Sequence, residues 1–154
     1  MMETESATEL FDAGMRHLEQ ENIDKALRSF EKAYKEDRTN PAYMSYYGLC
    51  KALRGGQIGL GLELCTMAIK KEFFRGDFYL NLGKVYLAAG NRKVAIKILK
   101  KGLKFEPRNQ EIHKSLAGLG CREKPVIESL ERSNPLNKLL GVFLRKKSAP
   151  SRRS

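Results

Sequence analysis

The hydrophobic positions of this chain recur with a helical period over most of its length. Apolar residues return every three to five positions, for example at Val94, Ile98 and Leu103, and this spacing places them on one face of an α-helix. No segment shows the sustained alternation of apolar and polar residues that is typical of a β-strand. The pattern predicts seven helices, near residues 7–20, 23–37, 41–54, 58–72, 76–89, 92–105 and 109–119.

Turn and capping residues separate these predicted helices. Asn40-Pro41 combines an N-cap side chain with a proline at the first helical position. Gly55-Gly56 and Gly90-Asn91 supply turn residues between the helices of a pair. The turn signals therefore agree with the periodicity and favour pairs of short helices.

A repeat of about 34 residues underlies the helices. A small residue that follows a larger one recurs at Gly14, Gly48, Gly83 and Ala117, at intervals of 34, 35 and 34 residues. Three triplets of small and larger residues follow at helical spacing, Ala26-Phe30-Ala33, Gly61-Cys65-Ala68 and Ala95-Leu99-Gly102. The second triplet starts one residue later than the others, which implies an inserted residue in that turn. Small residues at these positions let two helices approach closely, and neighbouring pairs must stack to bury their apolar faces.

This pattern resembles the tetratricopeptide repeat (TPR). The match is best in the third unit, where the positions of the pattern hold Tyr79, Leu82-Gly83, Tyr86, Ala95, Leu99 and Pro107. The first two units depart from the pattern at its tyrosine and proline positions, which hold His17, Arg38, Lys51 and Phe73. The resemblance covers residues 7–109 and implies an all-α fold, a right-handed superhelical stack of antiparallel helix pairs.

The resemblance also divides the chain. After a flexible N-terminus at 1–6, we expect a TPR-like domain at 7–120, with repeats at 7–40, 41–75 and 76–109 and a C-terminal capping helix at 110–120. An open stack needs a polar outer face at its end, and Glu111, Lys114 and Ser115 would supply it.

A C-terminal extension is expected at 121–147, followed by a disordered basic tail at 148–154. An amphipathic helix is predicted at Leu136–Lys147, because five apolar residues fall on one helical face: Leu136, Leu139, Leu140, Phe143 and Leu144. The end of the stack, another chain and a membrane are the surfaces that could cover this face, and the end of the stack is favoured because it is nearest. The segment 124–137 is also similar to tails of small bacterial repeat proteins. We therefore expect a small three-repeat protein of bacterial origin.

In the TPR family, the first helix of each pair lines a concave groove that binds other proteins. Carried onto this chain, the groove positions are Phe11, Met15, Leu18, Ser45, Leu49, Ala52, Asp77, Leu80 and Lys84, with Thr8, Ala42 and Leu87 completing the set. Such a mostly apolar groove suits an amphipathic helix or an apolar peptide. The alternative is that Phe11 and Met15 pack against the N-terminus or a second copy of the chain.

One subset of the family grips the C-terminal carboxylate of a chaperone peptide with a set of Lys, Asn and Arg side chains. The corresponding positions here hold Phe11, Met15, Tyr46, Asp77 and Asn81. Only Asn81 has suitable chemistry and Asp77 has the wrong charge, so the resemblance does not extend to this carboxylate clamp.

The charge is unevenly distributed along the chain. Residues 1–40 hold ten acidic and six basic residues, a net −4, while residues 41–154 hold eight acidic and twenty-three basic residues, a net +15, which together give +11. A basic run on the predicted helix at 92–105 consists of Arg92, Lys93, Lys97, Lys100, Lys101 and Lys104. With the basic tail, this run makes an electrostatic binder of nucleic acid or of an anionic membrane the alternative function. Single-stranded nucleic acid also needs aromatic side chains for stacking, and Phe105 and Phe143 are too few for it.

Catalytic and metal-binding constellations are not evident in the sequence. His17 and His113 are isolated, and the three cysteines form no CxxC pair, so Cys50 and Cys65 are expected in the core. The glycine-rich segment 55–61 lacks the strand and the Lys-Ser/Thr of a phosphate-binding loop. We therefore expect a non-catalytic adaptor without a cofactor, whose partner is another protein.

The location of the protein follows from absent signals. No apolar run reaches the length of a membrane span, and the acidic start of the chain is unlike a signal peptide. The sequence therefore predicts a cytoplasmic protein.

Overall fold

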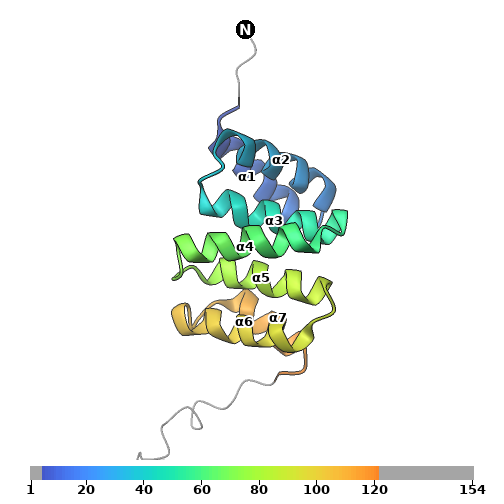
Figure 1. Cartoon of the computed structure of the whole chain (residues 1–154), viewed down its shortest axis with the longest axis vertical. Coiled ribbons are helices and arrows are strands. Elements are labelled where there is room, and N and C mark those ends of the chain that lie inside the picture. The colour runs from blue at the N-terminus through green and yellow to red at the C-terminus, as the bar shows by residue number, and fades with distance from the viewer. Residues whose placement is uncertain (1–4, 122–154) are drawn as a thin grey trace, which may run out of the picture. The chain divides into compact units, whose positions relative to one another are not determined.

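The computed structural model describes residues 5–121, and within this range the chain forms seven α-helices and no β-strand. The helices are α1 (Ala7–Glu19), α2 (Ile23–Glu36), α3 (Pro41–Gly55), α4 (Ile58–Lys71), α5 (Gly76–Ala88), α6 (Arg92–Phe105) and α7 (Gln110–Gly118). They follow one another as stacked layers, in chain order (Figure 1). Every boundary lies within one residue of the boundary expected from the sequence, and the expected all-α stack of helix pairs is confirmed.

Polar side chains determine where most of these helices begin. At α1, the amide N–H of Ser6 donates to Glu9 Oε2 at 2.7 Å, and the Ser6 hydroxyl oxygen accepts from the Glu9 amide at 3.3 Å. Backbone amides in the first turns of α2, α3, α6 and α7 donate to Asn22, Asn40, Asn91 and Asn109. Each of these caps satisfies an amide that the helix leaves unpaired, which is typically worth about 1 kcal/mol.

The two helices of a pair approach closely at small residues. A Cβ atom on Gly14 would lie 2.5 Å from Phe30 Cε1, and one on Gly83 would lie 2.7 Å from Leu99 Cδ2. Ala95, which faces the same pair of helices, is fully buried. These are positions at which the repeat predicts close contacts, so the predicted register is confirmed.

The inserted residue of the second repeat is accommodated at the end of its first helix. α3 has 15 residues, whereas α1 and α5 have 13 each. Gly56 follows the last residue of α3 as its C-cap, and its φ of 63° lies in the left-handed region that glycine adopts without strain. The insertion therefore lengthens one helix and leaves the spacing of the next repeat intact.

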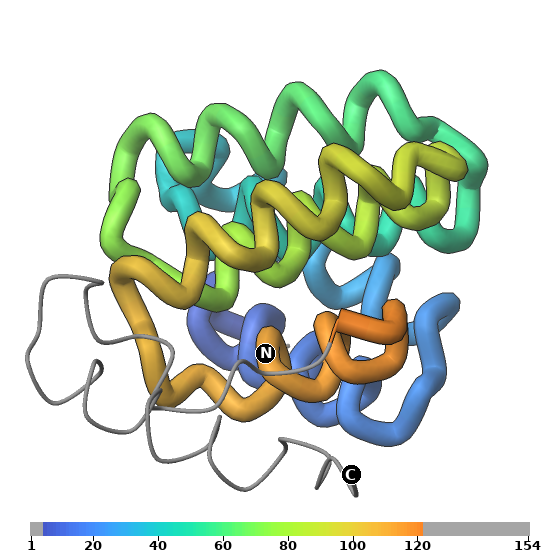
Figure 2. Tube along the Cα trace, turned by 90° about the horizontal axis from the view of Figure 1, so that it is seen from below, coloured from blue at the N-terminus to red at the C-terminus, as the bar shows by residue number. Residues whose placement is uncertain are grey.

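The core runs between the helix layers, and its largest fully buried side chains include Phe30, Leu49, Phe78, Tyr79 and Leu99. α3 lies in the middle of the stack and packs against α2, α4 and α5 (Figures 1 and 2). α7 packs against α5 and α6 through the buried Ile112 and Leu116, while Glu111 and Lys114 remain exposed. This is the polar outer face that we expected of a capping helix.

The helical unit ends at Gly120. Residues 1–4 and 122–154 lie outside the described residues, so the amphipathic helix expected at Leu136–Lys147 and the basic tail expected at 148–154 stay predictions. Among the helices that the structure describes, none is both long and apolar enough to cross a lipid bilayer.

Candidate functional site

The residues predicted to line the groove lie on α1, α3 and α5, the first helices of the three pairs. Four of them are buried and have less than a tenth of their surface exposed, namely Ser45, Leu49, Ala52 and Leu80. Thr8 is exposed, and the partly exposed ones are Phe11, Met15, Leu18, Ala42, Asp77, Lys84 and Leu87. Helices on both sides of α3 cover its side chains, so the surface available to a ligand is narrower than the repeat pattern indicated.

At the α1 end of this face, the candidate groove is aromatic. The ring of Phe11 lies 5.4 Å from Phe30, 5.2 Å from Tyr43 and 5.5 Å from Tyr46, measured between ring centroids. Met15 and Leu18 pack against the same cluster. These three α1 side chains are therefore partly engaged in the core and expose only part of an apolar strip.

The middle of the face is a polar cluster around Asp77. The Tyr46 hydroxyl donates to Asp77 Oδ2 at 3.1 Å, and the Arg75 guanidinium donates to both Asp77 oxygens at 3.0 and 2.9 Å. Arg75 also pairs with Glu72 and lies over the Phe78 ring at 4.5 Å. Burial and the neighbouring Asp77 carboxylate raise the pKa of Tyr46, and hydrogen bonding to Asp77 raises the pKa of Arg75. Arg75 thus pairs with both Asp77 and Glu72, and the single guanidinium offsets only part of their negative charge.

The same cluster determines whether the carboxylate-clamp positions can bind the C-terminal carboxylate of a peptide. Asn81 is 2% exposed, and its side-chain amide donates to the Ser45 hydroxyl at 3.0 Å. A peptide carboxylate at this place would meet the negative Asp77 and would find no available amide donor. The geometry therefore agrees with the sequence in disfavouring a clamp.

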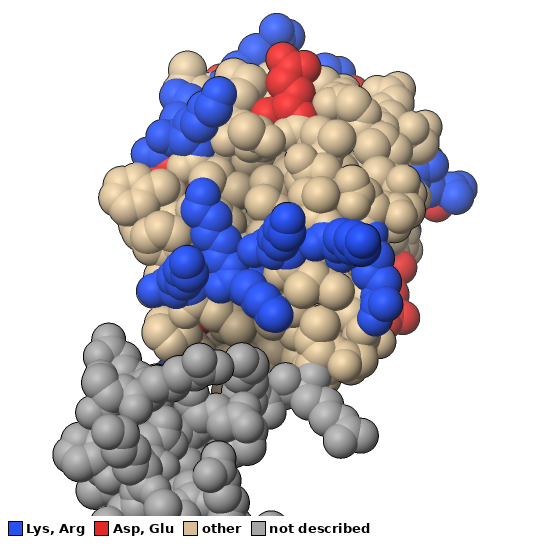
Figure 3. Space-filling model, turned by 60° about the horizontal axis from the view of Figure 1, so that its bottom comes forward, with Lys and Arg blue, Asp and Glu red and all other residues tan. Residues whose placement is uncertain are grey.

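The basic run lies on α6, and its last four residues form the surface that we call the lysine face: Lys97, Lys100, Lys101 and Lys104. With Phe105 they line a hollow of about 440 Å³. Figure 3 shows the Lys and Arg side chains gathered in a band across this side of the molecule. Arg92, at the start of α6, donates to the carbonyl oxygen of Leu119. Within the described part of the chain, no ion pair neutralises the lysine face.

An exposed aromatic cluster adjoins the lysine face, and sequence reasoning missed it. Phe73 and Phe74, between α4 and α5, are 59% and 55% exposed, and Phe105 is 39% exposed. The centroid of Phe73 lies 5.8 Å from that of Phe74 and 5.7 Å from that of Phe105. The adjacent Phe73-Phe74 pair is visible in the sequence, but its contact with a residue 32 positions away is a property of the stack.

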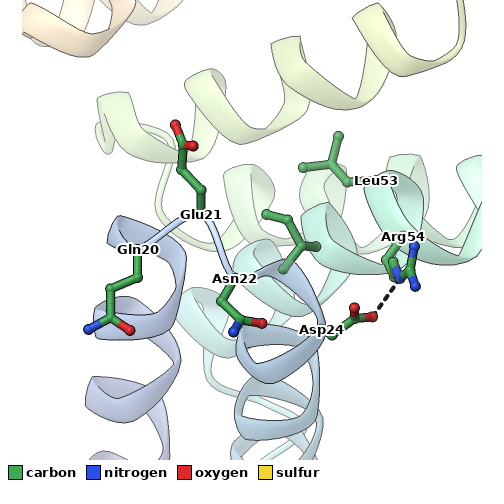
Figure 4. A pocket seen from close by; sticks show the side chains of 7 residues that line it. Gln20, Glu21, Asn22, Asp24, Leu53 and Arg54 are labelled. Atoms are coloured by element: carbon green, nitrogen blue, oxygen red, sulfur yellow. Dashed lines mark hydrogen bonds and ion pairs between the residues drawn. The ribbon is translucent and has the colours of Figure 1, made fainter.

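A second hollow, of about 480 Å³, lies between the α1–α2 turn and the end of α3 (Figure 4). Its lining residues are Gln20, Glu21, Asn22, Ile23, Asp24, Leu53 and Arg54. Arg54 is already paired with Asp24, and both side chains are more than half exposed, so this pair is screened by solvent. The lining has neither a histidine nor a nucleophile, and it offers no basis for a catalytic assignment.

The buried thiols are unsuited to nucleophilic chemistry. Cys50 and Cys65 are fully buried, and burial raises the pKa of each thiol to about 12. The Cys65 thiol donates to the carbonyl oxygen of Ser45 at 3.3 Å. The expectation that both cysteines belong to the core is confirmed, whereas Cys121 is partly exposed.

The comparisons with known proteins agree with the repeat. Residues 76–109, the unit with the best match to the pattern, match the family model of the tetratricopeptide repeat. The U-box domain-containing protein 70 of rice (Oryza sativa subsp. japonica) is 27% identical over 142 residues, which are 91% of this chain and 17% of that protein. The chain thus spans about one-sixth of the length of this relative. A plant relative does not support the bacterial origin that we expected.

Several solved TPR structures share the fold. The first TPR of Spaghetti (RPAP3) bound to the HSP90 peptide SRMEEVD has a TM-score of 0.59 and 21% identity, over 75% of this chain and 93% of that one. YrrB, a TPR protein with an unusual peptide-binding site, has a TM-score of 0.60 and 18% identity, over 74% and 58%. TTC0263, a thermophilic TPR protein from Thermus thermophilus, has a TM-score of 0.63 and 21% identity, over 75% and 67%. Residues 76–109 therefore match the tetratricopeptide repeat, and the helical stack around them has the fold of solved TPR domains.

Proposed function

We propose that this chain is a non-catalytic adaptor that binds a peptide or helical segment of another protein across the α1, α3 and α5 face. The observation that carries the proposal is the stack of three in-register helix pairs, which presents equivalent positions of three repeats along one surface. Proteins of the same fold have been solved with peptides, among them the RPAP3 domains with HSP90 and HSP70 peptides. Neither a cofactor nor a catalytic step forms part of this proposal, and the cytoplasmic location stays an expectation.

The surface determines what the segment should look like. At the α1 end, Phe11, Met15 and Leu18 offer a partly exposed apolar strip, which suits an apolar anchor. In the middle, Asp77 is already bound by Arg75, so neither charge is available in full to a partner. Towards the end of α5, Lys84 is partly exposed and suits an acidic residue. The proposed ligand is therefore an internal segment with an apolar anchor and an acidic group, rather than a free C-terminal carboxylate.

The test uses the full chain as an immobilised bait for proteins from a native lysate at moderate salt, with the captured proteins quantified. Met15→Glu introduces a charge into the apolar strip, and Lys84→Glu reverses the charge at the other end. Both side chains are partly exposed, so neither change places a charge in the closed core. We expect each variant to lose the same small set of captured proteins.

The matched control is Lys32→Glu, the same charge reversal on the exposed side of α2. This variant should retain the set, and all variants should keep the helical circular dichroism of the unchanged protein. If Met15→Glu and Lys84→Glu capture the same proteins as the control, the face is not the binding site and the proposal fails.

A further inference from the structure

The lysine face and the exposed phenylalanines form one continuous surface, because Phe105 belongs to both. Phe105 ends α6 and lines the hollow with the four lysines, and its ring contacts Phe73 in the turn before α5. We call this composite surface, made of the lysine face with Phe73, Phe74 and Phe105, the lysine–phenylalanine surface. It lies on the third repeat and its junction with the second, away from α1.

The charge of this surface suits a ligand with several anionic groups in a line. Lys97, Lys100, Lys101 and Lys104 follow one another at spacings of three, one and three residues, so they form a row about 10 Å long on one side of α6. No acidic residue occurs in α6. The two nearest carboxylates in the sequence are engaged elsewhere: Glu106 accepts from the amide of Gly76 at 2.9 Å, and Glu111 pairs with Lys114 at 3.0 Å.

The phenylalanine rings are held in place before any ligand arrives. Tyr79 stacks on Phe105 with 5.5 Å between the ring centroids and 19° between the ring planes. The Tyr79 hydroxyl donates to the carbonyl oxygen of Phe73 at 2.8 Å, which ties the exposed turn to the same tyrosine. The three rings of Phe73, Phe74 and Phe105 therefore pack against one another in a row. Because these side chains are already held in place, binding a ligand to them costs little side-chain conformational entropy.

We propose that the lysine–phenylalanine surface binds single-stranded nucleic acid, with phosphates along the lysine face and unpaired bases on the phenylalanine rings. A row of cations beside aromatic rings is the combination by which proteins hold single strands without sequence preference. A duplex keeps its bases stacked inside and would leave the rings without a partner. The cations of the row are lysines, which bind phosphate as point charges and lack the forked donors that arginine uses to recognise guanine. The binding is thus independent of sequence.

An anionic membrane is the competing ligand, and the arrangement of the rings argues against it. Membrane-binding side chains must project beyond their surroundings to enter the interface. Here Phe73 contacts both Phe74 and Phe105, and Phe105 stacks on Tyr79, so the rings are held against one another. This inference does not depend on the α1, α3 and α5 face, and changes at Met15 or Lys84 leave it untouched.

The experiment follows the fluorescence anisotropy of a labelled oligodeoxythymidylate of about 15 nucleotides, mixed with the full chain at several salt concentrations. Binding should weaken as salt increases, with a logarithmic slope of about −2.8 if all four lysines contact phosphates. Lys97→Glu/Lys101→Glu should weaken binding at least tenfold and reduce the slope by about 1.4. The matched control is Arg28→Glu/Lys32→Glu, which reverses two exposed charges at the equivalent positions of the first repeat and should bind as the unchanged protein.

Two substitutions of Phe73 distinguish the stacking of bases on an aromatic ring from hydrophobic contact alone. The Phe73 ring is more than half exposed, so substitution leaves the core intact. Phe73→Leu keeps an apolar side chain but removes the aromatic face, and we expect it to weaken oligonucleotide binding at least fivefold. Phe73→Trp should bind as tightly as the unchanged protein or more tightly. Equal binding by the leucine and tryptophan variants would contradict the stacking of bases on this ring.

Two further outcomes overturn the proposal. One is binding to vesicles of phosphatidylcholine and phosphatidylserine without binding to the oligonucleotide, which would assign the surface to membranes. The other concerns the basic residues beyond the described part of the chain, tested with Lys146→Glu/Lys147→Glu. If that variant loses the oligonucleotide while Lys97→Glu/Lys101→Glu retains it, the lysine face is not the site.

Discussion

Gly61 provides the sharpest test of how the helix pairs pack. A Cβ atom at this position would lie 2.8 Å from the Cβ of Ala52, 2.8 Å from the backbone oxygen of Gly48 and 3.3 Å from Cγ1 of Val85. Two of these three atoms are fixed to the backbone of α3 and cannot rotate away. Gly61→Ala therefore forces α3 and α4 apart by about half an ångström, since ordinary contacts begin near 3.4 Å.

Two opposing effects determine the size of the change. Replacing a helical glycine by alanine stabilises a helix by about 0.8–1.0 kcal/mol, because alanine loses less backbone entropy on folding. Overpacking a closed core costs about 1–3 kcal/mol. Gly59 lies in the same helix and is exposed, and a Cβ atom there would meet nothing within 4 Å. Gly59→Ala therefore has the stabilising effect of alanine on the helix without the overpacking. The difference between the unfolding free energies of the two variants measures the cost of overpacking.

Urea unfolding followed by circular dichroism measures both variants. We expect Gly59→Ala to be more stable than the unchanged protein by up to about 1 kcal/mol. Gly61→Ala should be less stable than Gly59→Ala by about 1–3 kcal/mol. Equal free energies of unfolding for the two alanine variants would refute the close contact of α3 with α4 and the repeat register that predicts it.

Two further predictions concern the core. Ala95→Phe places a large ring where the alanine is fully buried, and the free energy of unfolding in urea should fall by about 1–3 kcal/mol. Burial raises the pKa of Cys50 and Cys65 from 9.0 to about 12, so between these values unfolded thiols lose protons that folded thiols keep. The unfolding free energy should fall as pH rises through this interval, and the pH dependence should be weaker in Cys50→Ala/Cys65→Ala than in the unchanged protein.

The helices and their pairing follow from local information in the sequence. Asn40, Asn91 and Asn109 cap the helices that they precede, and Gly56 and Gly90 take up the left-handed conformation that ends a helix or turns the chain. Small residues at a period of 34 or 35 also determine which helices touch, because only a small side chain permits that approach. These signals act over a few residues or repeat at a fixed interval, so they can be recognised in the amino-acid sequence alone.

The tertiary structure decided which repeat positions are open and which are closed. Ser45, Leu49 and Ala52 occupy groove positions in the pattern, yet helices on either side of α3 bury them. Asp77 and Arg75 neutralise each other through a geometry that no spacing rule predicts. Phe73 and Phe105 meet only because α4 and α6 end on the same side of the stack. Sequence patterns determine what a segment becomes, whereas exposure and long-range contact depend on the neighbours that the stack places around it.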